Sequence, residues 1–146
     1  MDALSHMSYL SVFIANIVAF MFGGLWYTVL FGKVWKAEMG IDVAKEQEMQ
    51  ASGSMVKSMI VGFMTGLLSA FVMAYLLHAM DMLNINDALI LSFLIGLGIV
   101  GLTMISDGFY SGHSVKLMAI DVTHRVLQLM IVAAVYVLLA DFGWQG

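Results

Sequence analysis

The sequence predicts an all-α membrane protein whose four transmembrane helices form an antiparallel bundle. Of its 146 residues, 62% are hydrophobic and only 11% are charged, whereas soluble domains are nearer to about half apolar and about a quarter charged. Four apolar runs, each long enough to cross a bilayer, are separated by polar connections. We therefore expect one transmembrane domain over residues 1–146, with the lipid bilayer as its main partner.

The composition also excludes several kinds of site. The chain has no cysteine, so disulfides and thiolate metal sites cannot form. It has no proline, so that residue kinks none of its helices. The net charge of -4 and the scarcity of Lys and Arg argue against nucleic-acid binding.

The first predicted span covers residues 8–30. At ~1.5 Å per residue it can cross a hydrocarbon core of ~30 Å with some tilt. Small side chains recur every fourth residue at Ala15, Ala19 and Gly23, which predicts a surface for close helix packing. Aromatic rings follow this row and also occur near the C-terminus, and such rings are typical of anchors at the lipid headgroups. The predicted anchors are Trp26, Tyr27, Trp35 and Trp144.

The connection over residues 31–54 holds most of the charge. Lys33 and Lys36 come directly after the first span, and Asp42 is placed to cap a short helix that runs through Gln50. Because positive charge favours the cytoplasmic side of a membrane, we expect this connection to be cytoplasmic.

The second predicted span, residues 55–80, carries a longer row of small side chains at a spacing of four. Helix backbones approach closely along such a row, and a row of five is more specific than a single pair. Thr65 and Ser69 lie beside it. The row consists of Ser58, Gly62, Gly66, Ala70 and Ala74.

The third and fourth predicted spans cover residues 88–106 and 117–140. Every Lys and Arg falls in, or within reach of, the first and third connections. Since four spans place both termini on one side, the positive-inside rule predicts both termini on the non-cytoplasmic side. The location that we expect is the inner (plasma) membrane of a bacterium.

Two stretches of the chain are similar to a known family. They are Gly23-Gly24-Leu25-Trp26-Tyr27, followed by Leu30-Phe31-Gly32-Lys33 and Trp35, and a later segment with Lys116-Leu117 and Ile120-Asp121. Together they resemble domain-of-unknown-function family 1761, small bacterial membrane proteins predicted to have four spans. The resemblance implies a fold and a location, and no catalytic residue comes with it.

Asp121, His124 and Arg125 are the strongest candidates for chemistry. They stand at positions i, i+3 and i+4, so they share one helix face. An Arg at the bilayer centre costs ~2.5–3.5 kcal/mol on insertion scales, and pairing with Asp121 or snorkelling would reduce that cost. Two interpretations stay open: an ion pair that fixes the depth of the helix, and a relay for protons or ions.

Asn16 is the most buried polar side chain that the sequence predicts. One interpretation is a hydrogen bond between helices, with Thr65 or Ser69 as its partner, worth ~0.6–2 kcal/mol. The other is that Asn16 lines a polar pathway with these two hydroxyls.

A metal site is a weak candidate. Two imidazoles and two carboxylates near one loop are able to bind a divalent cation, but their spacing matches no named metal motif. We therefore expect neither a metal nor another cofactor. The residues concerned are Asp107, His113, Asp121 and His124.

The sequence supports two hypotheses about function. The first is a structural or partner-binding helical bundle without enzymatic activity, in the form of a homo-oligomer or with a membrane-protein partner. The second is a small channel or transporter for ions, protons or a small solute. Its pathway would use Asn16, Thr65, Ser69, Asp121, His124 and Arg125.

Overall fold

The computed structural model describes residues 3–141 and confirms the all-α membrane fold. Within these residues no strand occurs, and four helices are long and apolar enough to cross a membrane. The third of them extends beyond the predicted range at both ends. Trp144, one of the predicted anchors, lies outside the described residues. The four spans are Tyr9–Leu30, Ser54–Ala79, Ile85–Tyr110 and Val115–Ala140.

The helical elements follow one another with short connections. Two of the spans contain a π-helical segment, in which the helix winds more widely than an α-helix. The first span consists of α1 (Tyr9–Leu25) and the π-helical η2 (Trp26–Leu30), and the third consists of α5 (Ile85–Ile95), the π-helical η3 (Gly96–Gly101) and α6 (Leu102–Tyr110). The other elements are η1 (Ala3–His6), α2 (Gly32–Glu38), α3 (Val43–Ala51), α4 (Ser54–Ala79) and α7 (Val115–Asp141).

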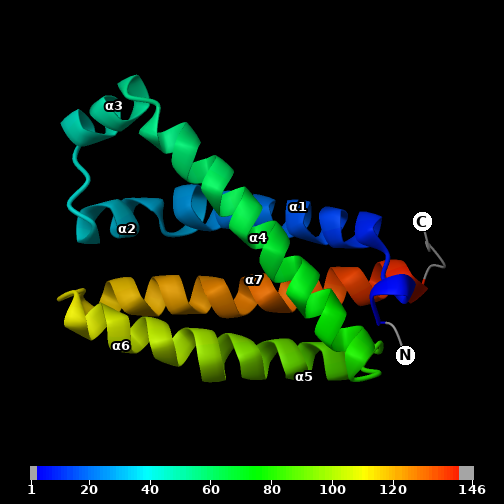
Figure 1. The fold of residues 1–146 in the computed structure, drawn as a ribbon. Coiled ribbons are helices and arrows are strands. Elements are labelled where there is room, and N and C mark those ends of the chain that lie inside the picture. Colours follow the sequence, from blue (N-terminus) through cyan, green and yellow to red (C-terminus); the bar gives the residue numbers. More distant parts are fainter. Residues whose placement is uncertain (1–2, 142–146) are drawn as a thin grey trace.

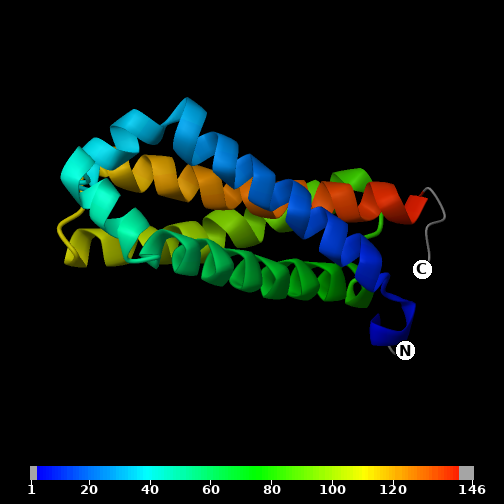
Figure 2. The same cartoon turned by 90° about the horizontal axis from the view of Figure 1, so that it is seen from above.

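Helix α7 is the central helix of the bundle. It packs against α1 on one side and α5 and η3 on the other, and α4 crosses the bundle obliquely (Figure 1). The bundle has two distinct ends, which we call the α2–α3 end and the N-terminal end. The α2–α3 end holds α2, α3 and the loop between α6 and α7, and η1 and the turn between α4 and α5 lie at the N-terminal end (Figures 1 and 2).

Short polar side chains start several of the helices. Asp42 caps α3 as predicted, because its Oδ1 accepts a hydrogen bond of 2.8 Å from the Lys45 amide. Ser8 caps α1 and Asn84 caps α5 in the same way. These caps satisfy amides that the first turn of a helix leaves unpaired.

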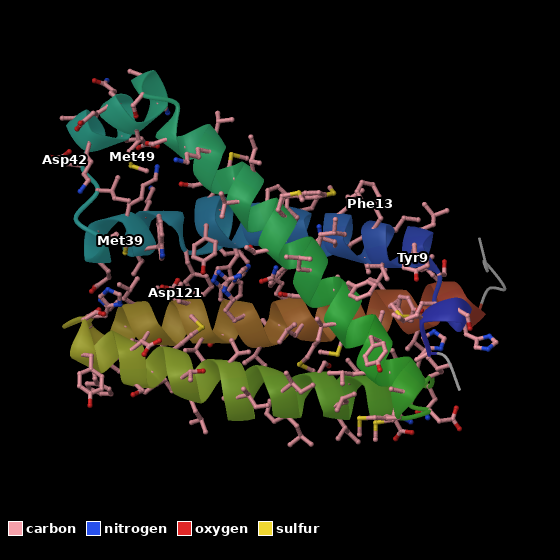
Figure 3. The ribbon with its side chains drawn as sticks, in the orientation of Figure 1. Tyr9, Phe13, Met39, Asp42, Met49 and Asp121 are labelled. Carbon is pink, nitrogen blue, oxygen red and sulfur yellow. The ribbon has the colours of Figure 1, made fainter. Side chains whose placement is uncertain are left out.

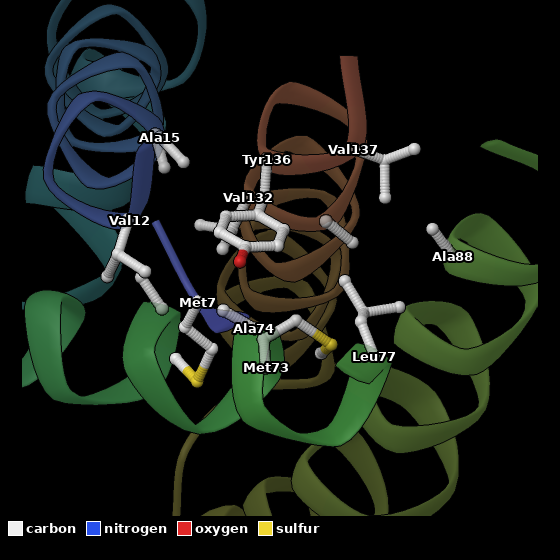
Figure 4. Packing of buried hydrophobic residues seen from close by; sticks show 13 residues of the cluster. Met7, Val12, Ala15, Met73, Ala74, Leu77, Ala88, Val132, Tyr136 and Val137 are labelled. Atoms are coloured by element: carbon white, nitrogen blue, oxygen red, sulfur yellow. The ribbon is translucent and has the colours of Figure 1, made fainter. Parts of the chain in front are cut away.

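The apolar core lies toward the N-terminal end, where α1, α4, α5 and α7 meet (Figure 4). Tyr136 and Leu77 fill its centre and are 1% and 0% exposed. Around them, Ala15, Ala74 and Ala88 are fully buried, because small side chains let the helices approach closely.

The small-residue row of α4 is buried along only half of its length. Gly66, Ala70 and Ala74 pack into the bundle, whereas Ser58 and Gly62 are exposed. A Cβ atom at Gly62 would have no atom within 4 Å. The oblique crossing of α4 therefore carries its first half away from the bundle interior, toward the α2–α3 end (Figure 1).

Candidate functional site

Most of the buried polar side chains among residues 3–141 belong to the start of the chain and α1 or to α7. Ser11, Asn16 and His124 have exposed fractions of 1%, 1% and 5%. Polar groups are costly to bury in hydrocarbon, so their burial calls for a physical explanation. We call this set the polar seam: Ser8, Ser11, Asn16 and Tyr27 from the first span, and Asp121, His124, Gln128 and Tyr136 from α7.

Asp121 forms the end of the polar seam nearest to α2 (Figure 3). Its Oδ1 accepts hydrogen bonds from the Tyr27 hydroxyl at 2.8 Å and from Trp35 Nε1 at 3.2 Å. The two rings also pack edge to face, with their centroids 5.2 Å apart. Asp121 is therefore satisfied by side chains from two other elements.

The π-helical turn η2 brings these rings to Asp121. Its last bond runs from the Phe31 amide to the Trp26 carbonyl at 2.9 Å, which closes a wider turn than an α-helix has. A Cβ atom at Gly32 would lie 2.8 Å from the Tyr27 carbonyl oxygen, so only glycine allows the chain to turn so closely into α2. Helix α2 then carries Trp35 back over α7.

The ion pair between Asp121 and Arg125 is absent from the described part of the chain, which contradicts that sequence interpretation. Tyr27 and Trp35 take up the carboxylate instead. Arg125 donates from Nη1 to Gln128 Oε1 at 3.1 Å. This bond joins its guanidinium to a residue one turn further along α7, on the side of the N-terminal end.

His124 is enclosed by aromatic rings. The Phe22 ring stacks on the imidazole, with centroids 5.8 Å apart and planes inclined by 3°. Tyr27 packs edge to face at 4.7 Å, and Trp26 lies at 6.1 Å. A Cβ atom at Gly23 would come within 3.1 Å of His124 Nε2, so glycine at this position leaves the room that the imidazole occupies.

Neither ring nitrogen of His124 has a hydrogen-bond partner within residues 3–141. The indole Nε1 of Trp26, beside it, is also buried and without a partner in this part of the chain. A buried polar group that makes no hydrogen bond costs about 1–3 kcal/mol. A buried group of this kind is expected to have a functional role or to bind a water molecule or an ion.

Asn16 and Gln128 lie together near the middle of the polar seam. Asn16 Nδ2 donates to the Phe63 carbonyl of α4 at 3.3 Å. A Cβ atom at Gly66 would lie 2.7 Å from Asn16 Oδ1 and 3.6 Å from Gln128 Nε2, so both amides meet at this glycine.

The predicted bond of Asn16 to Thr65 or Ser69 does not form, because both hydroxyls face outward. Thr65 donates to the Val61 carbonyl at 2.9 Å, and Ser69 donates to the Thr65 carbonyl at 3.0 Å. Each hydroxyl is thus satisfied one turn back on its own helix, which is common for Ser and Thr in helices. Thr65 and Ser69 lie outside the polar seam.

At the other end of the polar seam, His78 of α4 meets Tyr136. The His78 Nε2 to Tyr136 hydroxyl distance is 2.7 Å. His78 also lines a cleft of about 790 Å³ at the N-terminal end, together with His6, Ser8 and Tyr75. The polar seam therefore begins beside a polar cleft. The sequence did not predict a role for the Tyr136 hydroxyl, because Tyr136 stands alone in an apolar stretch of α7.

The remaining predicted residues are placed as follows. Gly23, predicted to pack a helix, faces His124, and Trp26, Tyr27 and Trp35, predicted as anchors, turn toward His124 and Asp121. The four weak metal candidates do not converge: in residues 3–141 no group of three or more His, Cys, Asp or Glu is placed to hold a metal. Asp107 and His113 are exposed.

Four spanning helices with a polar seam between the first and the last define this chain as a multi-pass membrane protein. Its residues 10–137 match the model of the family described as "Protein of unknown function (DUF1761)", and the chain belongs to that family. This confirms the resemblance carried by the motif around Trp26 and Tyr27. Comparison with the curated proteins and with the solved structures gave no match.

Proposed function

We propose that the protein is a small proton channel or proton-linked transporter of the bacterial inner membrane, without enzymatic activity. The observation that carries this proposal is His124, a buried imidazole inside a membrane-spanning helix whose two ring nitrogens have no hydrogen-bond partner among the described residues. Ionisable side chains within a span are rare and typically mark a pathway for protons or ions. An imidazole is also the side chain whose ordinary pKa is closest to physiological pH.

The order of groups along the polar seam supports a pathway. From the N-terminal end, His78 meets Tyr136, the amides of Asn16 and Gln128 meet at Gly66, and His124 follows one helical turn beyond Gln128. Tyr136 and Gln128 stand two turns apart on α7, and between them lies Val132, an apolar side chain that is 2% exposed. In the proposed mechanism, water enters this apolar stretch transiently when α4 moves, and the seam is closed at rest.

At the α2–α3 end, Asp121 is the group that would exchange protons with His124. The two residues stand at i and i+3 on α7, and Tyr27 contacts both: its hydroxyl donates to Asp121 and its ring packs on the imidazole. Opening of the Tyr27 and Trp35 bonds would admit water to Asp121. These two bonds therefore act as the proposed gate at this end.

The distribution of charge supports the proposed orientation, with the α2–α3 end in the cytoplasm and both termini on the other side. Lys33, Lys36 and Lys45 all lie in α2 or α3 or next to them, and Lys116 starts α7 at the same end. Basic residues in short connections favour the cytoplasmic side.

A proton-flux measurement tests the proposed function. The purified protein in liposomes that enclose a pH-sensitive dye should acidify the lumen when an inside-negative potential is imposed. The His124→Leu and Asn16→Ala variants should lose most of this flux, because each removes a group that holds or passes the proton. Flux in wild-type liposomes no greater than in empty ones would contradict the proposal.

Two matched controls separate a pathway from a general loss of structure. His113→Leu changes an exposed loop histidine, and Thr65→Ala changes an exposed hydroxyl that is bonded to its own helix. Both should conduct like the wild type. If either control lowers the flux as much as the change at His124, the polar seam is not the route.

A second candidate function is self-association or the binding of another membrane protein, and the exposed half of the α4 row favours it. Ser58 and Gly62 present small side chains at the surface, where a second helix has room to approach. Gly62→Leu should then shift the mass of the detergent-solubilised protein to a smaller assembly, and Gly98→Leu, at another open glycine, should not. Equal masses for both variants and the wild type would exclude this role for the row.

A further inference from the structure

Arg125 is exposed although it lies well inside a membrane-spanning helix. It stands ten positions after Val115, the first residue of α7, which at ~1.5 Å per residue is about 15 Å along the helix. In the part of the chain that the structure describes, no carboxylate lies within ion-pair distance of it. The guanidinium has five N–H donors, and its one hydrogen bond among the described residues goes to Gln128.

The exposure of Arg125 follows from the path of α4. Gln128, Val132 and Tyr136 stand at i+3, i+7 and i+11 from Arg125, so they share its helix face. Helix α4 covers this face at two places: His78 contacts Tyr136, and Gly66 lies against Gln128. A Cβ atom at Gly62, one turn before Gly66, would have no atom within 4 Å, and Arg125, one turn before Gln128, is exposed. These two positions border an opening next to the contact of Gly66 with Gln128.

An apolar groove lies one helical turn beyond Arg125. It has a volume of about 290 Å³ and is lined from three sides: Leu68 and Val72 belong to α4, Val100 belongs to η3, and Leu129 belongs to α7. Leu129 stands four residues after Arg125, so the groove and the guanidinium lie on neighbouring parts of the same helix surface. Ser69 also lines the groove, and its hydroxyl is satisfied by the Thr65 carbonyl.

We propose that this opening binds one anionic phospholipid, whose phosphate contacts Arg125 and one of whose acyl chains lies in the groove. The charge of the phosphate complements a guanidinium that has no acidic partner among the described residues, and Arg pairs with phosphate through two parallel hydrogen bonds. The groove lies in the middle of two spans, where lipid chains are the surrounding medium. Gln128 belongs to the polar seam and also bonds to Arg125, but lipid binding at Arg125 requires no proton movement, so the proposal does not depend on the proton pathway.

The depth of Arg125 is compatible with such a ligand. An Arg within a span draws water and headgroups inward by thinning the bilayer locally. The guanidinium already donates a hydrogen bond to Gln128 Oε1. A phosphate oxygen that replaces Gln128 Oε1 would accept this bond instead. A lipid held in this way occupies a fixed position, unlike the lipids that merely surround the protein.

Lipid retention measured by native mass spectrometry tests the site. The probes are phosphatidylglycerol and phosphatidylcholine with identical acyl chains, added to the detergent-solubilised full chain. We expect the wild type to retain one phosphatidylglycerol with clear preference over phosphatidylcholine. In Arg125→Gln the affinity for phosphatidylglycerol should fall about ten-fold, as is typical when a charge-assisted contact is lost. Retention of both lipids alike by the wild type would overturn the proposal.

Three further variants keep the outcome clear even if Arg125→Gln folds poorly. Lys116→Gln removes a positive charge at the end of the bundle and should retain the preference for phosphatidylglycerol. If it loses as much affinity for this lipid as Arg125→Gln does, the lipid is held by surface charge and not by a site. Ser69→Phe fills the groove from an exposed position, and it should weaken retention of both lipids. Val61→Phe adds the same ring to an exposed position of α4 outside the groove, and it should retain both. Wild-type retention in Ser69→Phe would exclude the groove as the seat of the acyl chain.

Discussion

The hydroxyl of Tyr27 donates a hydrogen bond to Asp121 across a sequence separation of 94 residues, and so it joins the end of the first span to the start of the last. The same carboxylate oxygen accepts from Trp35, so three elements meet at one atom. Because the Tyr27 ring also packs on His124, any change at this contact reaches the histidine directly.

Tyr27→Phe should destabilise the bundle by about 1–3 kcal/mol, because it removes one of the two donors to a half-buried carboxylate. The loss is measurable as a lower midpoint of thermal or detergent unfolding, followed by circular dichroism. Tyr110→Phe is the matched control, since Tyr110 is 93% exposed and should tolerate the change. Equal midpoints for the two variants would show that the bond to Asp121 adds nothing to stability.

Gly96→Ala should lower stability by about 1–3 kcal/mol through overpacking. The new Cβ atom would lie 3.1 Å from the Cα of Val126, and a backbone atom of α7 cannot move aside cheaply. Gly98→Ala, in the same π-helical segment, meets no atom within 4 Å and should be neutral or slightly stabilising. Unfolding curves of the two purified variants check this, and a Gly96→Ala protein as stable as Gly98→Ala would contradict the close contact of η3 with α7.

Acid should loosen the attachment of α2 to the start of α7. The hydrogen bond from the Ser114 hydroxyl, 2.5 Å long, and then the neighbouring Lys116 hold the pKa of Glu38 below its ordinary value, although partial desolvation opposes them. Since the folded protein favours the carboxylate form, this contribution is complete above the ordinary pKa and is lost as the pH falls through the lowered pKa.

Hydrogen exchange of the first turn of α7 measures this effect. After correction for the intrinsic dependence on pH, the protection of the Leu117 amide, which donates to Ser114 Oγ, should fall at acidic pH. Glu38→Gln should lack this fall, and Glu48→Gln, at an exposed position of α3, should keep it. The same pH profile in Glu38→Gln and the wild type would rule out the carboxylate as the cause.

Single cysteines should report the two ends of the bundle on opposite sides of the membrane. The chain has no cysteine of its own, so an added one is the only thiol. With the proposed orientation, Asn86→Cys should react with a membrane-impermeant maleimide in intact spheroplasts, and Glu48→Cys should react only after permeabilisation. Both positions are exposed. The reverse pattern would invert the orientation, and labelling of both in intact cells would contradict the bundle.

The fold was predictable because hydropathy is a local property of the sequence. Four long apolar runs require four spans in lipid, and Asp42 marks a helix start by its position alone. The candidate site was predictable only in part. Asn16, Asp121 and His124 could be selected because polar groups are rare in spans, but their partners could not, since Phe63, Tyr27 and Trp35 reach them from other helices.

Periodicity was informative about faces and uninformative about crossing angles. The row from Ser58 to Ala74 predicts one continuous packing surface, yet α4 crosses the bundle obliquely and buries only the part from Gly66 onward. Likewise, Thr65 and Ser69 have the chemistry of a pathway, but each bonds to its own helix and faces outward. Which of two neighbouring helix faces turns inward is decided by the other helices.

The wide turn at η3 has a consequence for the third span as a whole. Gly96 and Gly101 both contact α7, although they stand five positions apart and an α-helix would turn them to different sides. Deleting Gly98 would restore ordinary winding and rotate the rest of the helix by about 100°. Gly108 would then turn away from Met118, and a bulkier residue of the third span would lie against Met118 instead. The register of this helix is thus encoded by one extra residue, and a shortened span with unchanged hydropathy would still be misassembled.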